Sequence, residues 1–244
     1  MHEASQHDHN SFITLTYSDE HLPAGGSLHK PDFQKFMKRL REQTQQKIRY
    51  YMCGEYGDKL GRPHYHALIF GYDFSDKTLW EIRKENKFYR SKQLEKLWRL
   101  GYSSISEVTF SSAAYVARYV MKKINGQKAH DHYQKLDKET GELIPVHPEY
   151  NSMSLKPGIA SNWYEKFTSD VYPADNIILS GKKYRTPRYY DRKLKAAYPG
   201  AHEILKTRRK KQALKHLANN TPERLKVREN IAIAKNKLNP RTLK

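Results

Sequence analysis

Alternating apolar and polar residues predict three strands near the start of the chain. In a strand, successive side chains point to opposite faces of the sheet. The predicted strands are Phe12–Tyr17, Ile48–Cys53 and His64–Phe70. Phe12–Tyr17 has bulky or β-branched residues on both faces, which indicates a buried central strand. The other two are separated by a turn rich in Gly and Pro, so we expect them to pair as an antiparallel hairpin.

Apolar residues recur at helical spacing in three further segments. The predicted helices are, in order, Lys30–Arg41, Leu79–Leu100 and Ala113–Ile124. Gly101 is expected to be the C-cap of the second helix, and Ser111 or Ser112 the N-cap of the third. A short strand is expected between these two helices, at Ser103–Thr109.

Beyond residue 125 the apolar pattern weakens. Gln127–Pro157 is polar and rich in turn residues, which predicts a long loop or insertion. A short helix is expected from Trp163 to Phe167, and a short strand at Asn176–Leu179. The whole pattern predicts an α+β fold, with a mostly antiparallel central sheet and helices packed on one or both faces.

Charge separates the end of the chain from the rest. The 244 residues hold 45 Lys+Arg and 26 Asp+Glu, a net charge of +19. From Gly181 to Lys244 there are 20 Lys/Arg and 4 Asp/Glu, so 16 of these 19 charges lie there. We therefore predict a domain at 1–180 and a basic, mainly helical tail at 181–244. A basic run can be a solvated face, but this charge points to a polyanion, nucleic acid first and acidic lipid second.

Several classes of protein are disfavoured by what the sequence lacks. Cys53 is its one cysteine, so a disulfide framework or a cysteine-based zinc site is not expected. No apolar run reaches the roughly 18 residues of a membrane span, and no signal peptide opens the chain. There is no phosphate-binding loop, hence no recognisable motor, and no His-Glu-x-x-His motif of a metalloprotease.

His64 and His66 are the first candidates for chemistry. At positions i and i+2 of a strand, both imidazoles point to one face, while Tyr65 points to the other. Imidazole is the commonest side-chain metal ligand. Glu55, near the hairpin turn, is a possible third ligand. The alternatives are a pair of surface histidines and a solvated turn carboxylate.

Tyr115 and Tyr119 are the second set of candidates. They lie four residues apart, hence on one face of the predicted helix, and Lys122 and Lys123 follow. This set suits transesterification at a DNA phosphate, in which a tyrosine attacks phosphorus beside a metal ion. The alternatives are half-buried packing for the tyrosines and exposure to solvent for the lysines.

These motifs together resemble a known family. The sequence looks like the replication initiators of the microviruses, closest to their gokushovirus branch, which belong to the HUH endonuclease superfamily. The similarity runs from about residue 1 to residue 195. The motifs that carry it are Phe12–Tyr17, Arg62–His66, Tyr115–Lys123, Gly54–Gly57, Trp163–Phe167 and Tyr189–Arg192.

The resemblance implies roles for individual residues. His64 and His66 match the metal-binding histidines of the family, and Glu55 matches the position of a carboxylate ligand. Tyr115 and Tyr119 match the two nucleophiles, and either Lys122 or Lys123 matches a nearby basic residue. The implied cofactor is a divalent metal, Mg²⁺ or Mn²⁺, although such a ligand set also suits zinc.

The resemblance also implies a function. It is rolling-circle initiation: nicking of a single-stranded origin, a covalent 5′-phosphotyrosine intermediate, and strand rejoining. The implied partners are single-stranded DNA, the replication origin, and the helicase and replication machinery of the host, in the cytoplasm of a bacterial cell, with no membrane. Fewer residues precede the first motif than in most family members, which suggests a truncated or reassigned start.

Two other functions fit parts of the pattern. A related HUH relaxase or transposase would share the metal site and tyrosine chemistry. A non-catalytic basic nucleic-acid-binding protein would share the charge and have incidental histidines. Formation of a covalent protein–DNA adduct separates the enzymes from the binding protein.

Overall fold

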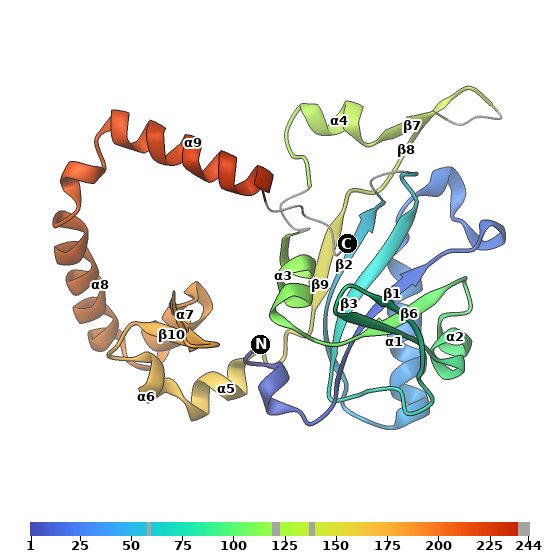
Figure 1. Ribbon diagram of the computed structural model, residues 1–244, viewed down its shortest axis with the longest axis horizontal. Helices are drawn as coiled ribbons and strands as arrows, with labels where there is room; N and C mark the ends of the chain where they lie inside the picture. Colours follow the sequence, from blue (N-terminus) through green and yellow to red (C-terminus); the bar gives the residue numbers. More distant parts are fainter. Residues whose placement is uncertain (58–59, 119–122, 137–139, 239–244) are drawn as a thin grey trace. The chain divides into compact units, whose positions relative to one another are not determined.

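The computed structural model describes residues 1–57, 60–118, 123–136 and 140–238 (Figure 1). The described residues form two compact units, one at 1–161 and one from 162 onward. The proposed division into a 1–180 domain and a basic tail stays a prediction. None of the described helices combines the length and the apolar character that a membrane span needs.

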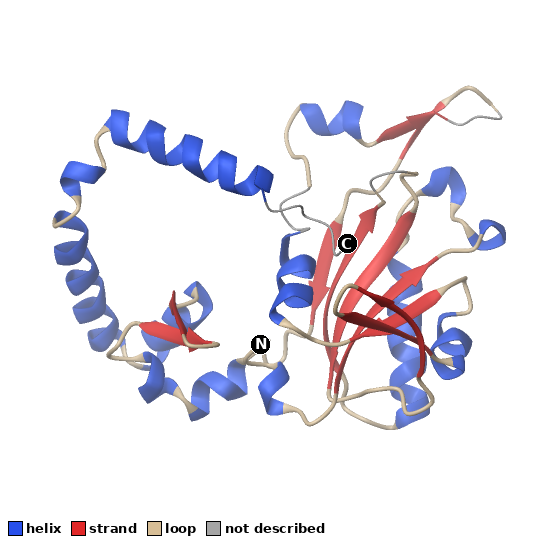
Figure 2. Ribbon diagram, in the orientation of Figure 1, coloured by secondary structure: helices blue, strands red, loops and turns tan. Residues whose placement is uncertain are grey.

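A central antiparallel sheet organises the first unit (Figure 2). In the part of the chain that the structure describes, seven strands lie in the order β4-β5-β6-β1-β3-β2-β9. Their bounds are β1 Asn10–Thr16, β2 Arg49–Tyr56, β3 Pro63–Phe70, β4 Thr78–Arg83, β5 Asn86–Arg90, β6 Ser103–Ser106 and β9 Tyr150–Met153. The sheet and its helices confirm the α+β class. The predicted strand at Phe12–Tyr17 and the β2–β3 hairpin are also confirmed.

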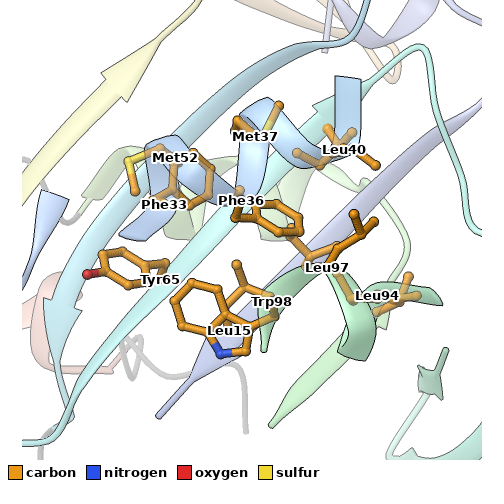
Figure 3. Close-up of a cluster of buried hydrophobic side chains, with 14 of the residues drawn as sticks. Leu15, Phe33, Phe36, Met37, Leu40, Met52, Tyr65, Leu94, Leu97 and Trp98 are labelled. Carbon is orange, nitrogen blue, oxygen red and sulfur yellow. The ribbon is translucent and has the colours of Figure 1, made fainter. Parts of the chain in front are cut away.

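One face of the sheet carries the main core. Helix α1 (Lys30–Thr44) and helix α2 (Lys92–Trp98) cover this face (Figure 1). Figure 3 shows side chains from both helices packed against the strands: Leu15, Phe33, Phe36, Met37, Leu40, Met52, Tyr65, Leu94, Leu97 and Trp98. Burying each large apolar side chain stabilises the fold by about 1.5–3 kcal/mol. The predicted helix from Lys30 is thus confirmed, and it continues to Thr44.

The opposite face carries a smaller core under helix α3 (Phe110–Arg118), which packs on β2 and β3. Its buried residues are Ala4, Phe12, Cys53, Leu68, Phe70 and Val116. In β3, Tyr65, Ala67 and Ile69 therefore lie in the main core, while Leu68 and Phe70 lie under α3. The alternation expected for this strand is confirmed.

The predicted helix at Leu79–Leu100 is wrong over most of its length. Its first part forms the hairpin of β4 and β5, in which Lys84 takes a left-handed φ of 55° at the turn. Branched and aromatic residues in both strands favour extended backbone. Only Lys92–Trp98 is helical, and Arg99, with φ 64°, is its C-cap in place of Gly101. Gly101 instead packs so closely on the backbone at and just after the end of β1 that a Cβ there would lie 2.2 Å from the nitrogen of Ser18.

Helix α3 begins earlier than predicted. Thr109 and Ser112 bind each other's backbone: the N–H of Thr109 donates to Ser112 Oγ at 2.8 Å, and the N–H of Ser112 donates to Thr109 Oγ1 at 3.1 Å. Thr109 is therefore the N-cap, in place of Ser111 or Ser112. The helix is described as far as Arg118, and residues 123–125, inside the predicted helix, have no helical structure.

Residues 127–157, predicted as a long loop or insertion, contain several short elements. These are α4 Lys128–His132, β7 Gln134–Leu136, β8 Leu143–Pro145 and β9. Strands β7 and β8 form a separate hairpin, whereas β9 pairs with β2 at the edge of the main sheet. Short 3₁₀ turns lie nearer the start of the chain, at Ala4–Gln6, Asp19–His21 and Ala24–Gly26.

The second unit is mainly helical. Its elements are α5 Ser161–Lys166, α6 Thr168–Val171, β10 Asn176–Leu179, β11 Lys182–Arg185, α7 Arg188–Ala197, α8 Pro199–Leu214, a 3₁₀ turn at Leu217–Asn219 and α9 Pro222–Leu238. The short helix predicted from Trp163 and the strand at Asn176–Leu179 are confirmed. Arg209 of α8 pairs with Asp175 and Asp191, which fixes this helix to the unit. Most other described side chains of α8 and α9 are exposed.

Candidate active site

The β2–β3 hairpin brings Glu55, His64 and His66 together. His64 and His66 lie on one face of β3, and Glu55 pairs directly with His64 in the register of the two strands. The expectation that β2 ends before Glu55 is wrong, because the strand continues to Tyr56. Glu55 is therefore held in the ladder, with its side chain on the same face as the two imidazoles.

The three side chains converge on one oxygen. Glu55 Oε1 lies 3.0 Å from His64 Nε2 and 2.9 Å from His66 Nε2. Each residue offers one possible ligand atom for a metal ion, and these three atoms lie within 4.8 Å of one another. Glu55 is 1% exposed and His66 is 7% exposed, so the cluster is largely shielded from water. We call Glu55, His64 and His66 the triad.

Neighbouring groups orient both imidazoles. His64 Nδ1 lies 3.0 Å from the carbonyl oxygen of Arg62. A carbonyl only accepts hydrogen bonds, so Nδ1 carries the proton, and Nε2 is the nitrogen that can offer a lone pair to a metal ion. His66 Nδ1 lies 2.9 Å from Thr14 Oγ1. The sequence predicts that Thr14 belongs to the Phe12–Tyr17 strand, but it does not predict a role for this residue. That role follows from the register of β1 and β3, which pairs Thr14 with His66.

The donor set fits a small divalent cation. Neighbouring ligands of an octahedral ion at about 2.1 Å lie about 3.0 Å apart. The two nitrogen–oxygen separations in the triad, 3.0 and 2.9 Å, agree with that spacing. Two imidazoles and a carboxylate are compatible with Mg²⁺ or Mn²⁺ and also with zinc. The triad is thus a candidate metal centre, as expected, and the geometry leaves the identity of the metal open.

The electrostatics of the triad favour an ionised carboxylate. Burial alone would raise the pKa of Glu55, but when both imidazoles are protonated, their hydrogen bonds from Nε2 and their positive charge lower that pKa to about 2. A bound cation would take the place of these Nε2 protons. Glu55 therefore carries its negative charge at neutral pH. A divalent cation needs such a charge when it leaves water for a buried site.

Tyr115 reaches the triad from helix α3. Its hydroxyl donates to Glu55 Oε1 at 3.0 Å and lies 3.4 Å from His66 Nε2. Its ring packs edge-on against His66, with ring centres 4.9 Å apart, while the next residue, Val116, is buried in the core under α3. Tyr115 therefore packs as a half-buried residue and also presents its hydroxyl to the triad.

The sequence also singles out Tyr65, Tyr119, Lys122 and Lys123. Tyr119 and Lys122 lie outside the described residues. Lys123 is exposed and follows the end of α3. Tyr65 points away from the triad, as expected: its hydroxyl donates to the carbonyl oxygen of His29 in the main core, at 2.8 Å. Burial raises the pKa of Tyr65 to about 12.

Fold and site together define an α+β protein with a candidate centre of two histidines and a carboxylate beside a tyrosine hydroxyl. The sequence model of a family described as replication-associated proteins of the ORF2 type matches residues 10–124, the range that contains this site. The match to this family model and to the phage relatives below confirms the resemblance of this chain to microvirus replication-associated proteins.

Three relatives are replication-associated proteins of phages. Protein VP4 of Bdellovibrio phage phiMH2K is 36% identical over 208 residues, covering 81% of this chain and 62% of the relative. Protein ORF2 of Spiroplasma virus 4 is 31% identical over 226 residues, covering 86% and 66% respectively. Protein ORF4 of Chlamydia phage 1 is 29% identical over 203 residues, covering 77% and 46%. The alignments thus span less than two thirds of each relative, and no solved structure matches this chain.

Proposed function

We propose that this chain is a rolling-circle replication initiator that nicks single-stranded DNA by tyrosine transesterification at a metal centre. Its relatives are named replication-associated proteins. The observation that carries the proposal is the position of Tyr115, whose hydroxyl lies 3.0 Å from Glu55 Oε1 within a cluster able to hold a cation. A tyrosine that served packing alone would not need to direct its hydroxyl at such a cluster.

In the proposed step, the phenolic oxygen of Tyr115 attacks the scissile phosphorus. A bond forms between this oxygen and phosphorus, and the bond from phosphorus to the 3′ oxygen breaks. The proton of the phenol leaves the tyrosine, and the departing 3′ oxygen gains a proton to become a free hydroxyl. The product is a 5′-phosphotyrosine. This ester conserves the energy of the cleaved phosphodiester bond, so that the strand can be rejoined without a nucleotide cofactor.

The side chains of the chain have separate tasks in this step. Glu55, His64 and His66 hold the divalent ion, which when bound polarises the scissile phosphate and stabilises developing negative charge. Arg62, through its carbonyl, and Thr14 keep the two imidazoles in the orientation that binds it. Helix α3 fixes the nucleophile at this position, so little motion is needed before attack.

Strand rejoining needs a second transfer. We assign Tyr119 as the second nucleophile, four residues after Tyr115 in the sequence, and either Lys122 or Lys123 as a cation that stabilises phosphate charge. In that transfer Tyr119 attacks phosphorus at the next cleavage site, so that a second tyrosyl ester forms and the bond from this phosphorus to its 3′ oxygen breaks. The 3′ hydroxyl released in this way attacks the phosphorus of the Tyr115 ester, closes the displaced strand and frees the phenol of Tyr115. The sequence has no motor motif, so a host helicase would unwind the duplex.

Covalent trapping tests the proposed function. The protein is incubated with single-stranded DNA of a microvirus origin and Mg²⁺ or Mn²⁺, and the products are separated on a denaturing gel. We expect a protein–DNA adduct that requires the metal and is reduced by Tyr115→Phe. Tyr102→Phe is the matched control, because Tyr102 is an exposed tyrosine of the same unit. No adduct with any metal would leave only the non-catalytic DNA-binding function.

A further inference from the structure

The β4–β5 hairpin exposes large apolar side chains at one edge of the central sheet. Leu79, Trp80 and Ile82 are 54%, 50% and 56% exposed. Trp80 is the extra residue of a β-bulge, because the pairing with β5 shifts between Leu79 and Glu81. Grouped exposed apolar residues of this size mark interaction surfaces more often than isolated ones do.

The same hairpin concentrates positive charge. Residues 77–92 contain six Lys/Arg and two Asp/Glu, a net charge of +4. Residues 1–180 as a whole hold 25 Lys/Arg and 22 Asp/Glu, a net charge of +3, so the rest of this range has a net charge of −1. Lys84 and Lys87, at the tip of the hairpin, are both exposed. Six of the 25 Lys/Arg of residues 1–180 thus lie in or next to the hairpin, where Lys77 pairs with Asp73 and Arg83 with Glu81.

Arginines stack on the aromatic rings of the hairpin. The Arg90 guanidinium lies 4.3 Å from the centre of the Trp80 ring, and that of Arg83 lies 5.4 Å from the centre of the Phe88 ring. A guanidinium on one face of an indole orients the ring and leaves the other face for a further flat group. Cations alternating with aromatic rings are the pattern of proteins that bind single-stranded nucleic acid by stacking its bases.

The register of the sheet places Arg90, which stacks on Trp80, on the same face as the triad, while Leu79 pairs with Tyr89 on the opposite face. Thr14 pairs with His66 and with Ser104, and the pairing of Tyr89 with Ile105 brings Arg90 to the level of Ser104. Paired residues project to one face, so Arg90, Ser104, Thr14 and His66 form a row across β5, β6, β1 and β3. Three strand spacings separate the ends of the row, about 14 Å. A strand of DNA held at the triad could therefore continue to the hairpin.

We propose that the β4–β5 hairpin is a second binding surface for single-stranded DNA, on which Trp80 stacks a base close to the scissile phosphate. The inference rests on the proposed function for its ligand and adds the place where the flanking strand binds. An incoming protein strand is the alternative occupant of an edge strand. The bulge at Trp80 in the β4–β5 ladder makes the open edge of β4 irregular for such a strand, and the net charge of +4 over residues 77–92 favours phosphates.

Two substitutions at one position test this proposal. Binding of the full chain to a single-stranded origin oligonucleotide is measured at about 0.3 M salt, where contacts of the basic tail are weakened. We expect Trp80→Leu to raise the Kd by about 5-fold to 160-fold, the range for loss of one stacked base. Trp80→Phe keeps a ring and should change the Kd less than about 3-fold. Leu79→Ala is the matched control, since it removes exposed apolar surface but no ring.

The outcomes separate stacking from other contacts. Equal losses from Trp80→Leu and Leu79→Ala would show apolar docking without stacking and overturn the proposal. So would a Kd unchanged by Trp80→Leu. As a second measurement, Lys84→Gln with Lys87→Gln should reduce the slope of log Kd against log salt by about 0.7 per lost phosphate contact. Lys35→Gln with Lys38→Gln, on helix α1 across the sheet, should leave that slope unchanged.

Failure of this proposal is distinct from failure of the proposed function. Adduct formation is measured for wild type and Trp80→Leu at saturating DNA. If wild type forms the adduct while Trp80→Leu binds as tightly as wild type, the hairpin surface is wrong and the nicking function stands. If wild type forms no adduct while Trp80→Leu binds DNA more weakly, the nicking function is wrong and the hairpin surface stands.

Discussion

Tyr65 and Tyr115 carry the same phenol but lie on opposite faces of the central sheet. Tyr65 is buried in the main core under α1. Its hydroxyl donates a hydrogen bond to the carbonyl oxygen of His29 at 2.8 Å and accepts one from the N–H of His29 at 3.1 Å. Tyr115 directs its hydroxyl to Glu55. The main-core face is apolar and covered by two helices, whereas the triad face mixes a small core with charged groups. Position in the sheet, more than residue type, decides which tyrosine can react.

This comparison predicts that substitutions on the two faces change different quantities. Changes on the main-core face should alter the free energy of unfolding and leave metal binding intact in the folded protein. Changes on the triad face should alter metal affinity and adduct formation with little loss of stability. The four substitutions below run from the largest expected effect to the smallest.

Phe36→Ala should give the largest change, on the main-core face. Phe36 of α1 is fully buried and packs edge-on against the ring of Trp98, so removing its ring leaves a cavity. We expect the free energy of unfolding to fall by about 3–5 kcal/mol, measured by urea denaturation. Manganese affinity of the remaining folded protein should not change. A matching loss of metal affinity would show that the two faces are not independent.

Glu55→Gln should give the largest effect on the triad face. It keeps the shape of the side chain but removes the negative charge that we assign to the metal. We expect metal affinity, measured by titration with Mn²⁺, to fall at least about 100-fold, more than about 2.7 kcal/mol. Adduct formation should fall with it. Glu107→Gln, at an exposed loop residue of the same unit, serves as control. Unchanged metal affinity in Glu55→Gln would remove Glu55 from the ligand set.

Thr14→Val tests whether orientation of His66 matters. Valine has a similar shape but cannot bond to Nδ1, which now lies 2.9 Å from Thr14 Oγ1. Loss of such a partner lowers metal affinity by about 10-fold to 100-fold. Thr14→Ser restores the hydroxyl and should restore the affinity. A defect that serine does not correct would indicate altered strand packing as its cause.

Tyr65→Phe should have the smallest effect. The change removes a buried hydroxyl and leaves the ring, so the backbone groups of His29 lose a partner. We expect a loss of about 1–2 kcal/mol in the free energy of unfolding. The yield of DNA adduct should equal that of wild type. A lower yield in the folded variant would assign Tyr65 a part in the chemistry, which contradicts the division between the faces.

The sequence predicted the centre of the fold well, for a physical reason. The residues of β1 and β3 admit one assignment of faces, because a shift by one residue would place both histidines in the main core and Tyr65 on the face of the smaller core. The helical spacing of Phe33, Phe36, Met37 and Leu40 is equally specific. These elements position the two histidines.

The prediction failed where short apolar runs fit more than one structure. Leu79, Trp80 and Ile82 suited a helix as well as a strand, and local pattern alone could not show that they would extend the sheet at its edge. The end of β2 was set too early because Gly54 suggested a turn. Pairing with β3 and β9 instead holds this glycine in the ladder, where a Cβ would lie 2.9 Å from the ring of Tyr150.

Mapping the DNA-linked residue tests the central claim most directly. Trypsin cleaves after Arg118, so Tyr115 and Tyr119 fall in different peptides. The adduct formed with Mn²⁺ is digested with nuclease and trypsin, and the nucleotide-bearing peptide is sequenced by mass spectrometry, which also separates Tyr115 from Tyr102. In wild type and in Tyr119→Phe we predict a nucleotide on Tyr115. A nucleotide found only on other residues, or a full adduct yield in Tyr115→Phe with Tyr119→Phe, would contradict the account.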